Sequence, residues 1–162
     1  KNEPQLCVKL FCALLKKDNF ELAVQKAVEC GITEIAPLLT KNTVKLDFKR
    51  QRLEKIIKEA AEQSGRGQIP QLEKIMNFND ALKFAKSNDL NIIFDPKGEK
   101  FEKVKSKKLN VKSIGIFIGP EGGWDELELQ SANEHNLQII SLGKLILRSE
   151  TAAIIASYII SH

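Results

Sequence analysis

The segment that decides the fold is "FIGPEGGWDELELQSA", residues 117–132, together with the apolar run "SIGIFI" that leads into it. Three glycines and a proline lie between that run and a segment with helical periodicity. A continuous apolar run of this length is typical of a strand buried on both faces of a parallel sheet. Strand, glycine-rich turn and helix in this order predict an α/β unit, whose turn lets backbone N–H and C=O groups approach a ligand closely.

Two common phosphate-binding loops do not fit this turn. A P-loop needs a lysine for the phosphate charge and a hydroxyl for magnesium, but "GPEGGWDE" has acids at those places. A dinucleotide loop needs glycines spaced G-x-G-x-x-G, and here they read G-P-E-G-G. Asp125 and Glu128 instead predict a capping box at the start of the following helix. The turn therefore holds a ligand through neutral backbone contacts, or it is a tight connection without a ligand.

Short β-rich runs alternate with helical periods along the rest of the chain, which is the pattern of an α/β domain with a largely parallel sheet. We expect strands within residues 6–15, 32–39, 90–95, 113–118 and 137–143, and helices over about 18–31, 47–64 and 79–87.

The first two helices have clear inward faces and stop signals. Asp18 is the expected N-cap of the first helix, with Glu21 three residues on, and Gly31 and Gly65 are the expected ends of the two helices. The residues expected to face the core are Phe20, Ala23, Val24, Ala27 and Val28 in the first helix and Leu53, Ile56, Ile57 and Ala60 in the second. Arg66, between two glycines, is expected to hold an extended, exposed side chain.

Composition points to one ordinary domain. The 162 residues are 43% hydrophobic and 28% charged, with no apolar run long enough to span a membrane, so we expect a soluble cytoplasmic protein. Cys7, Cys12 and Cys30 lack a C-x-x-C spacing and are expected to be free thiols, and no metal site is expected. The net charge of +4 comes mostly from residues 97–112, which form either a solvated surface or a surface facing RNA.

A second loop region, "SLGKLILRSETAAIIASYIISH", occupies residues 141–162. Ser149 is expected to cap a last helix that is apolar on nearly every side, so this helix is buried in the core or against a second subunit. Arg148 precedes that cap. It is either a surface arginine, a partner for Glu150, or a functional residue.

Four blocks in a fixed order resemble the RsmE-type ribosomal RNA methyltransferases of the SPOUT superfamily. They are "VQKAVECGITEIAPL", "EAAEQSGRGQIP", "IGPEGGW" and "LGKLILRSETA", and the resemblance extends from about residue 14 to residue 158. It implies an α/β fold with a mostly parallel sheet flanked by helices and a trefoil knot near the C-terminus, a rare exception to unknotted topology. It also implies S-adenosylmethionine as cofactor and 3-methyluridine in small-subunit (16S) ribosomal RNA as product.

The resemblance assigns roles to individual residues. The two loops of the knot would hold the cofactor, and their glycines would let the backbone close around an adenosine that carries no phosphate. Arg148 would stabilise charge on the reacting pyrimidine, Arg66 and Arg52 would contact RNA, and Glu121 would either accept a hydrogen bond from the cofactor or order its loop. No general base is identifiable. The residues expected at the cofactor are Ile118, Gly119, Pro120, Glu121, Gly122, Gly123, Leu142, Gly143 and Leu147.

The chain departs from the family pattern in three places. Leu145 stands where the family reads arginine, and "TKNTV" at residues 40–44 lacks another arginine. Residues 1–162 match the catalytic domain, and we expect the family's β-rich RNA-binding domain to be absent from this chain. The resemblance further implies a homodimer acting on small-subunit ribosomal RNA or a ribosomal particle. The alternatives are a SPOUT methyltransferase with another target atom, or an inactive knotted module for RNA binding or dimerisation.

Overall fold

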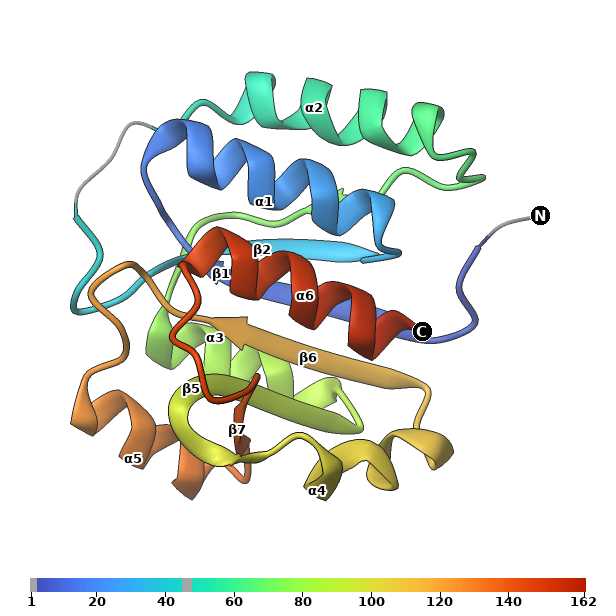
Figure 1. Ribbon diagram of the computed structural model, residues 1–162. Helices are drawn as coiled ribbons and strands as arrows, with labels where there is room; N and C mark the ends of the chain where they lie inside the picture. The colour runs from blue at the N-terminus through green and yellow to red at the C-terminus, as the bar shows by residue number, and fades with distance from the viewer. Residues whose placement is uncertain (1–2, 45–47) are drawn as a thin grey trace.

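The computed structural model describes residues 3–44 and 48–162, and the described part forms one parallel sheet between two layers of helices (Figure 1). The strands run in the order β3-β2-β1-β6-β5-β7, with β4 also pairing with β2. The strands are β1 (Cys7–Ala13), β2 (Glu34–Leu39), β3 (Gln71–Leu72), β4 (Met76–Asn77), β5 (Leu90–Lys100), β6 (Ser113–Ile118) and β7 (Gln138–Ser141). The α-helices are α1 (Lys17–Glu29), α2 (Arg50–Gln63), α3 (Phe78–Phe84), α4 (Glu102–Lys105), α5 (Glu126–Glu134) and α6 (Ser149–Ser161).

Each face of the sheet has its own apolar core. On β1, Leu10 and Cys12 belong to the core under α1, α2 and α6, whereas Phe11 belongs to the core under α3 and α5. This alternation follows from the two-residue period of a strand. Both faces are covered, which is why the central strands β1 and β6 are apolar along most of their length. The expected α/β class with a parallel sheet flanked by helices is confirmed.

The helix predictions held on their inward faces and failed at some ends. The five core residues predicted for α1 are all buried, and Gly31 after it has φ of +104°. Asp18 is not the N-cap, however. The cap residue is Lys16, whose side chain makes no capping bond; its backbone N–H is instead bound by the Glu121 carboxylate. In the same way α6 begins at Ser149 and is preceded by Arg148, so the predicted Ser149 cap is wrong by one residue.

The second helix also starts later than predicted. Helix α2 begins at Arg50, and the predicted start at Asp47 lies outside the described residues. Its predicted inward residues are buried except Ile56, which is only partly covered, and Ala61 is buried in addition. Among the described residues, no helix is both long enough and apolar enough to cross a lipid bilayer.

Strand β5 does not end before Pro96 as predicted, and the reason lies in β7. Ile140 of β7 is paired with Phe94 and again with Glu99, so the register shifts between these two residues of β5. The intervening residues form an irregular excursion around β7, a position where proline is tolerated within a sheet. A Cβ atom on Gly98 would lie 2.5 Å from the Ile140 backbone, so only glycine fits this close approach.

Candidate functional site

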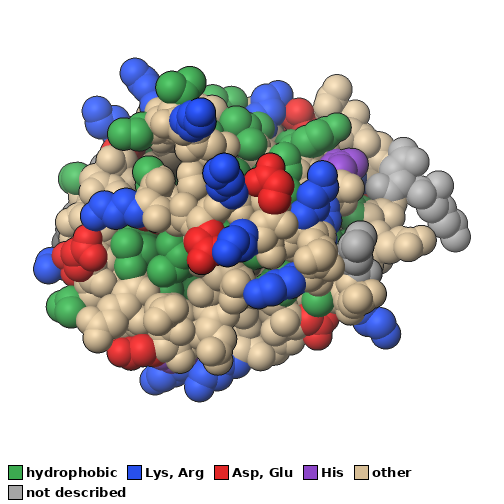
Figure 2. Space-filling view, turned by 60° about the horizontal axis from the view of Figure 1, so that its bottom comes forward, with side chains coloured by type: hydrophobic (Ala, Val, Ile, Leu, Met, Phe, Trp, Pro, Cys, Tyr) green, Lys and Arg blue, Asp and Glu red, His purple; other side chains and the backbone are tan. Residues whose placement is uncertain are grey.

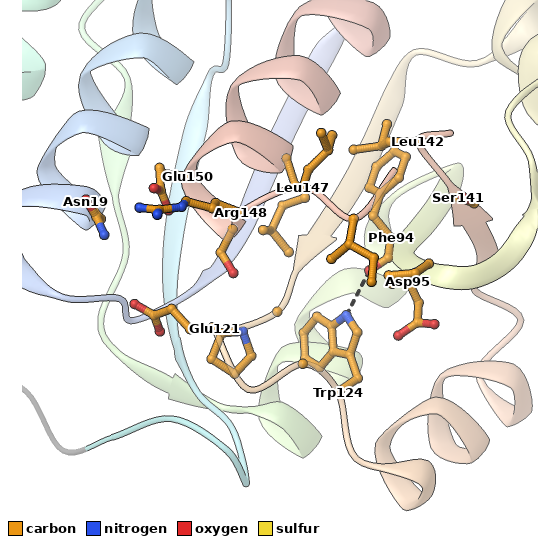
Figure 3. A pocket seen from close by; sticks show the side chains of 18 of the residues that line it. Asn19, Phe94, Asp95, Glu121, Trp124, Ser141, Leu142, Leu147, Arg148 and Glu150 are labelled. Atoms are coloured by element: carbon orange, nitrogen blue, oxygen red, sulfur yellow. Dashed lines mark hydrogen bonds between the residues drawn. The ribbon is translucent and has the colours of Figure 1, made fainter. Parts of the chain in front are cut away.

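A cavity of about 530 Å³ opens beside the excursion of β5 and the carboxyl ends of β6 and β7 (Figure 3). Three loops and the start of α1 form its wall. Phe94, Asp95 and Pro96 come from β5, and the other loops contribute residues from 118–124 and 141–150. The carboxyl ends of parallel strands are the usual place for ligands in open α/β sheets. The two loops singled out in the sequence therefore meet at one cavity.

Gly119 and Trp124 fix the wall of the cavity along the glycine loop. A Cβ atom on Gly119 would lie 3.1 Å from the Trp124 indole, so the glycine lets the ring pack flat against the loop. The Trp124 Nε1–H donates a hydrogen bond of 3.0 Å to the carbonyl of Phe94 (Figure 3). The indole thus ties the glycine loop to β5 at the point where its excursion begins. Gly123, at φ of +75°, completes the turn in a conformation that favours glycine.

Glu121 orders this loop against α1. Its carboxylate accepts a hydrogen bond of 3.1 Å from the backbone N–H of Lys16, the residue that precedes α1. One of the two predicted roles of Glu121, loop ordering, is therefore observed. Burial, with a further contribution from the Glu121 charge, raises the pKa of the Cys12 thiol to about 12. Cys12 is thus an inert core residue and not a nucleophile.

The helix after the glycine loop starts with the predicted capping box. The Asp125 carboxylate accepts from the N–H of Leu127, and Glu128 accepts from the N–H of Asp125. Glu128 also accepts from the N–H of Lys41, at 3.3 Å. The Lys41 ammonium, 3.2 Å from Asp125, lowers the pKa of that carboxyl. These acids therefore hold the loop and the 40–44 segment together.

Gly122 and Gly143 do not line the cavity, contrary to prediction. A Cβ atom on Gly122 would lie 3.1 Å from the Asn42 Cβ, and Asn42 donates hydrogen bonds to the carbonyls of Gly122 and Gly123. Gly122 thus faces the 40–44 segment. Gly143 is exposed in a turn closed by the Ser141 hydroxyl and has φ of +142°. The predicted residues that do line the cavity are Ile118, Gly119, Pro120, Glu121, Gly123, Leu142, Leu147 and Arg148.

Arg148 and Glu150 lie side by side at one end of the cavity (Figure 3). Arg148 is exposed, whereas Glu150 is 8% exposed. No hydrogen bond or ion pair joins them, or joins either side chain to another described residue. The alternative reading of Arg148 as an ion-pair partner of Glu150 is therefore wrong.

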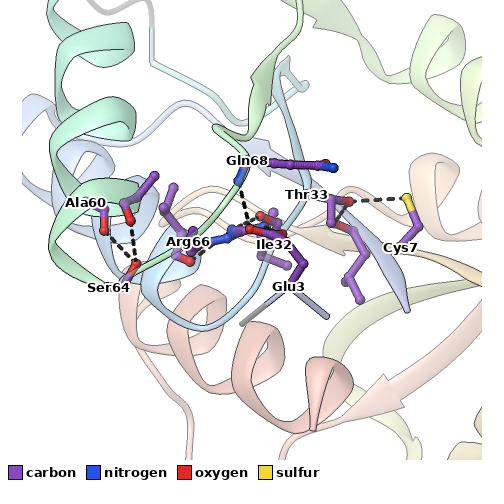
Figure 4. A network of polar contacts seen from close by, with 11 residues as sticks. Glu3, Cys7, Ile32, Thr33, Ala60, Ser64, Arg66 and Gln68 are labelled. Atoms are coloured by element: carbon purple, nitrogen blue, oxygen red, sulfur yellow. Dashed lines mark hydrogen bonds and ion pairs between the residues drawn. The ribbon is translucent and has the colours of Figure 1, made fainter. Parts of the chain in front are cut away.

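The prediction of an exposed Arg66 is wrong. Its side chain is 5% exposed, and its guanidinium donates to the carbonyls of Val28 and Ile32 and pairs with Glu3 at 3.1 Å (Figure 4). This cluster lies at the end of α1 and the start of β2, the opposite edge of the sheet from the cavity. Because the side chain is buried and its two Nη groups are bound inside the protein, Arg66 is a structural residue and is not available to RNA. Glu3, held by Arg66, has its pKa lowered by that hydrogen bond.

Arg52 is placed differently. It is 54% exposed and donates two hydrogen bonds, of 2.5 and 3.0 Å, to Glu21. Glu21 lies two residues after Asn19, which lines the cavity, so Arg52 is on the same edge of the molecule as the site. Its contact with RNA stays a prediction.

The basic stretch at residues 97–112 forms no concentrated positive patch. Lys97 pairs with Glu126 at 2.9 Å, and Lys103 pairs with Glu99 at 3.1 Å. Figure 2 shows Lys and Arg side chains dispersed over one face among acidic and apolar ones. A solvated surface is the simpler description of this stretch. Within the described ranges, no group of three His, Cys, Asp or Glu residues is arranged to hold a metal ion.

Sequence reasoning missed several residues of the site. Phe94, Asp95 and Pro96 stand at the end of the strand expected over residues 90–95, and the rule that ligands bind at the carboxyl ends of strands could have pointed to them. Trp124 directly follows the glycine loop and is the chain's single tryptophan. Asn19 carried no signal, because its place at the cavity depends on the contact between α1 and the glycine loop.

Comparison with known proteins agrees with this geometry. A family described as "RNA methyltransferase domain" matches residues 1–161. A ribosomal RNA small subunit methyltransferase E from Mesomycoplasma hyopneumoniae is 42% identical over 161 residues, which are 94% of this chain and 68% of that protein. The Bacillus subtilis protein of the same name is 33% identical, and the match covers 98% of this chain and 67% of that protein.

A solved structure is similar over the same region. The crystal structure of a ribosomal RNA small subunit methyltransferase E from Neisseria gonorrhoeae, bound to S-adenosylmethionine, superimposes with a TM-score of 0.87. It is 34% identical in sequence, and the match covers 96% of this chain and 65% of that one. The chain thus spans about two thirds of the length of these relatives. With the family match over residues 1–161, these findings show that the chain belongs to the RNA methyltransferase family.

Proposed function

We propose that this chain carries the catalytic domain of an enzyme that transfers a methyl group from S-adenosylmethionine to N3 of uridine in small-subunit ribosomal RNA, in the cytoplasm. The observation that carries the proposal is that the glycine loop and the 141–150 loop line the same cavity. The Neisseria relative, which shares 34% of the sequence, was solved with S-adenosylmethionine bound.

The cavity has the chemistry that this cofactor requires. One side is apolar, with Phe94, Trp124, Leu142 and Leu147, and suits an adenine ring. The other side is polar and charged, as the amino-acid end of the cofactor requires. Backbone groups of residues 118–121 and 142–147 would hold the adenosine, which carries no phosphate and so needs no lysine. When bound, S-adenosylmethionine would supply an electrophilic methyl group.

A trefoil knot fits the path of the chain around β7. The excursion of β5 between Phe94 and Glu99 wraps around Ile140, and the chain then continues from β7 through the 141–148 loop to α6. Helix α6 packs on α1, β1 and β6 (Figure 1), and its first turn lines the same cavity as Phe94 and Pro96 of the excursion. We infer that the C-terminal segment passes through the loop that the excursion of β5 forms. The cofactor loops would then be held rigidly by the knot.

Arg148 is the residue that we assign to the chemistry. Methylation at uridine N3 requires loss of the imide proton, and negative charge then spreads to the neighbouring carbonyl oxygens. Arg148 is exposed at the rim of the cavity, and its guanidinium has no partner among the described residues. A guanidinium can hold such an oxygen through paired N–H groups. Arg148 would therefore position the target base and stabilise its charge.

The outer faces of α1 and α6 support a homodimer. Ile155 and Tyr158 of α6 and Leu22 of α1 are 36%, 56% and 41% exposed. Leu145 and Ile146, beside the cavity, are 81% and 85% exposed. A second copy that covered these apolar side chains would remove them from water. Light scattering at micromolar concentration should give twice the chain mass, and a stable monomer would contradict the dimer.

Trp124 offers a direct test of cofactor binding. Because it is the single tryptophan and lines the cavity, addition of S-adenosylhomocysteine should change its fluorescence in a saturable way. Calorimetry should give the same dissociation constant. A folded protein that shows neither signal would rule out the proposed function and favour an inactive RNA-binding module. Transfer of the methyl group to an atom other than uridine N3 would favour the other alternative.

A further inference from the structure

Glu150 is a buried acid whose carboxyl group has no partner. It is the second residue of α6, is 8% exposed and lines the cavity. It accepts no hydrogen bond and forms no ion pair with any described residue. Glu128 is buried to a similar degree, at 9% exposed, but accepts hydrogen bonds from the N–H groups of Asp125 and Lys41. The contrast marks Glu150 as unusual within this fold.

Glu150 is mostly covered by the protein and reaches solvent at the cavity, so its carboxylate lacks most of the hydrogen bonds that it would accept in open water. The N-terminus of α6 favours a negative group, but this weak effect does not replace the hydrogen bonds that a carboxylate loses when it leaves water. An ionised carboxylate only accepts hydrogen bonds, so a compensating partner must be a donor or a cation. Arg148 and Lys16 also line the cavity, but neither forms an ion pair with Glu150. The missing partner is therefore expected to arrive with the ligand.

The position of Glu150 indicates which part of the ligand it meets. Figure 3 shows Glu150 with Asn19 and Arg148 on one side of the cavity, and Phe94 and Leu142 on the other. If the adenine ring occupies the apolar side, the amino-acid end of the cofactor reaches the side with Glu150. Arg148 is exposed at the rim of the cavity, whereas Glu150 is buried and lines the cavity wall.

We propose that Glu150 binds the ammonium group at the amino-acid end of S-adenosylmethionine, an inference that rests on the proposed function. The ammonium supplies three N–H donors and a positive charge, which together satisfy the buried carboxylate. The sulfonium carries charge but no N–H donor. Glu150 would thus select ligands with an intact amino-acid end and orient that end relative to the reacting methyl group.

The test compares two neutral-sulfur ligands by calorimetry. S-adenosylhomocysteine has the ammonium group, whereas 5′-methylthioadenosine lacks the whole amino-acid end. Glu150→Gln should weaken S-adenosylhomocysteine binding at least about tenfold, the scale of one lost charge-assisted hydrogen bond. Binding of 5′-methylthioadenosine should change less than about twofold. Glu59→Gln removes one negative charge from an exposed site on α2 and should leave both affinities unchanged.

The outcomes separate this inference from the proposed function. Unchanged S-adenosylhomocysteine binding in Glu150→Gln would overturn the assignment, as would equal weakening of both ligands. A melting temperature of the ligand-free variant several degrees below wild type would also overturn it, because that result would show a structural role. If the wild-type chain binds neither ligand, the proposed function fails, and this inference with it. If the wild type binds both and only the expected difference is missing, the proposed function stands.

Discussion

At the scale of single residues, the site depends on a glycine that leaves room for an aromatic ring and on which arginine guanidinium groups are already bound within the protein. Gly119 leaves room for the Trp124 indole, because a Cβ atom at this position would lie only 3.1 Å from the ring. Arg66 uses its guanidinium on backbone carbonyls and Glu3, so its charge serves the fold. Arg148 has no partner among the described residues, so its guanidinium is available for the substrate contact that we propose. Gly119, Arg66 and Arg148 were all candidate site residues in the sequence, but the structure places them in different surroundings.

Gly119→Val should disrupt the cavity. Its branched side chain would push the Trp124 indole away and break the hydrogen bond to the Phe94 carbonyl. We expect S-adenosylhomocysteine affinity to fall at least about tenfold in calorimetry, or about 1.4 kcal/mol. Gly67→Ala, whose Cβ would have no neighbour closer than 3.9 Å, is the control and should bind normally. Normal binding by Gly119→Val would remove this loop wall from the site.

Arg66→Ala should destabilise the protein, with no direct effect on RNA. It would leave Glu3 and the carbonyls of Val28 and Ile32 without their donor, at a cost of about 2–4 kcal/mol. Arg52→Ala removes an exposed ion pair and should cost less than about 1 kcal/mol. Urea unfolding followed by Trp124 fluorescence measures both. Equal stability of the two variants would show that the Arg66 cluster contributes little.

Arg148→Ala should separate cofactor binding from chemistry. We expect S-adenosylhomocysteine affinity to stay within a few-fold, because the side chain is exposed at the rim. Single-turnover methyl transfer should nevertheless fall by about two orders of magnitude, the scale of one lost charge-stabilising donor. Normal transfer by a stable Arg148→Ala protein would refute the catalytic assignment. A joint loss of stability and cofactor binding would indicate a structural arginine.

At the scale of elements, the apolar runs and the inward faces of α1 and α2 could be predicted from the sequence, since period and burial are local properties. The extension of β5 past Pro96 could not, because it depends on pairing with Ile140, more than 40 residues later. The burial of Arg66 could not be predicted either, because the carbonyls that accept its hydrogen bonds belong to α1 and to the segment just before β2. The two loops expected at the cofactor stood out in the sequence because glycines mark close backbone approach, and part of each lines the cavity.

The start of α5 predicts a pH-dependent stability. The hydrogen bond from Lys41, followed by that from the Leu127 N–H, lowers the pKa of Asp125. A lowered pKa stabilises the fold above the unfolded value of about 3.9, and this contribution disappears as pH falls through the folded value. Asp125→Ala should therefore lower the melting temperature at pH 7, and the difference from wild type should shrink toward pH 2. A difference that is constant over this range would contradict the capping role.

At the scale of the whole molecule, the loops around the cavity and the Arg66 cluster lie at opposite ends of the strands of the parallel sheet. The cavity lies beside the excursion of β5 and the carboxyl ends of β6 and β7. The Arg66 cluster lies just before the amino end of β2. Variants at the two edges should therefore act independently. The exposed apolar side chains on α1, on α6 and beside the cavity form the surface on which we propose that a second copy packs.

The most direct test of the account is single-turnover transfer of labelled methyl groups from S-adenosylmethionine to small-subunit ribosomal RNA that lacks 3-methyluridine. The RNA would then be digested to nucleosides and the label identified by mass spectrometry. The account predicts label in 3-methyluridine, and its near-complete loss in Arg148→Ala. Label in any other nucleoside, or no transfer by a protein that binds the cofactor, would contradict it.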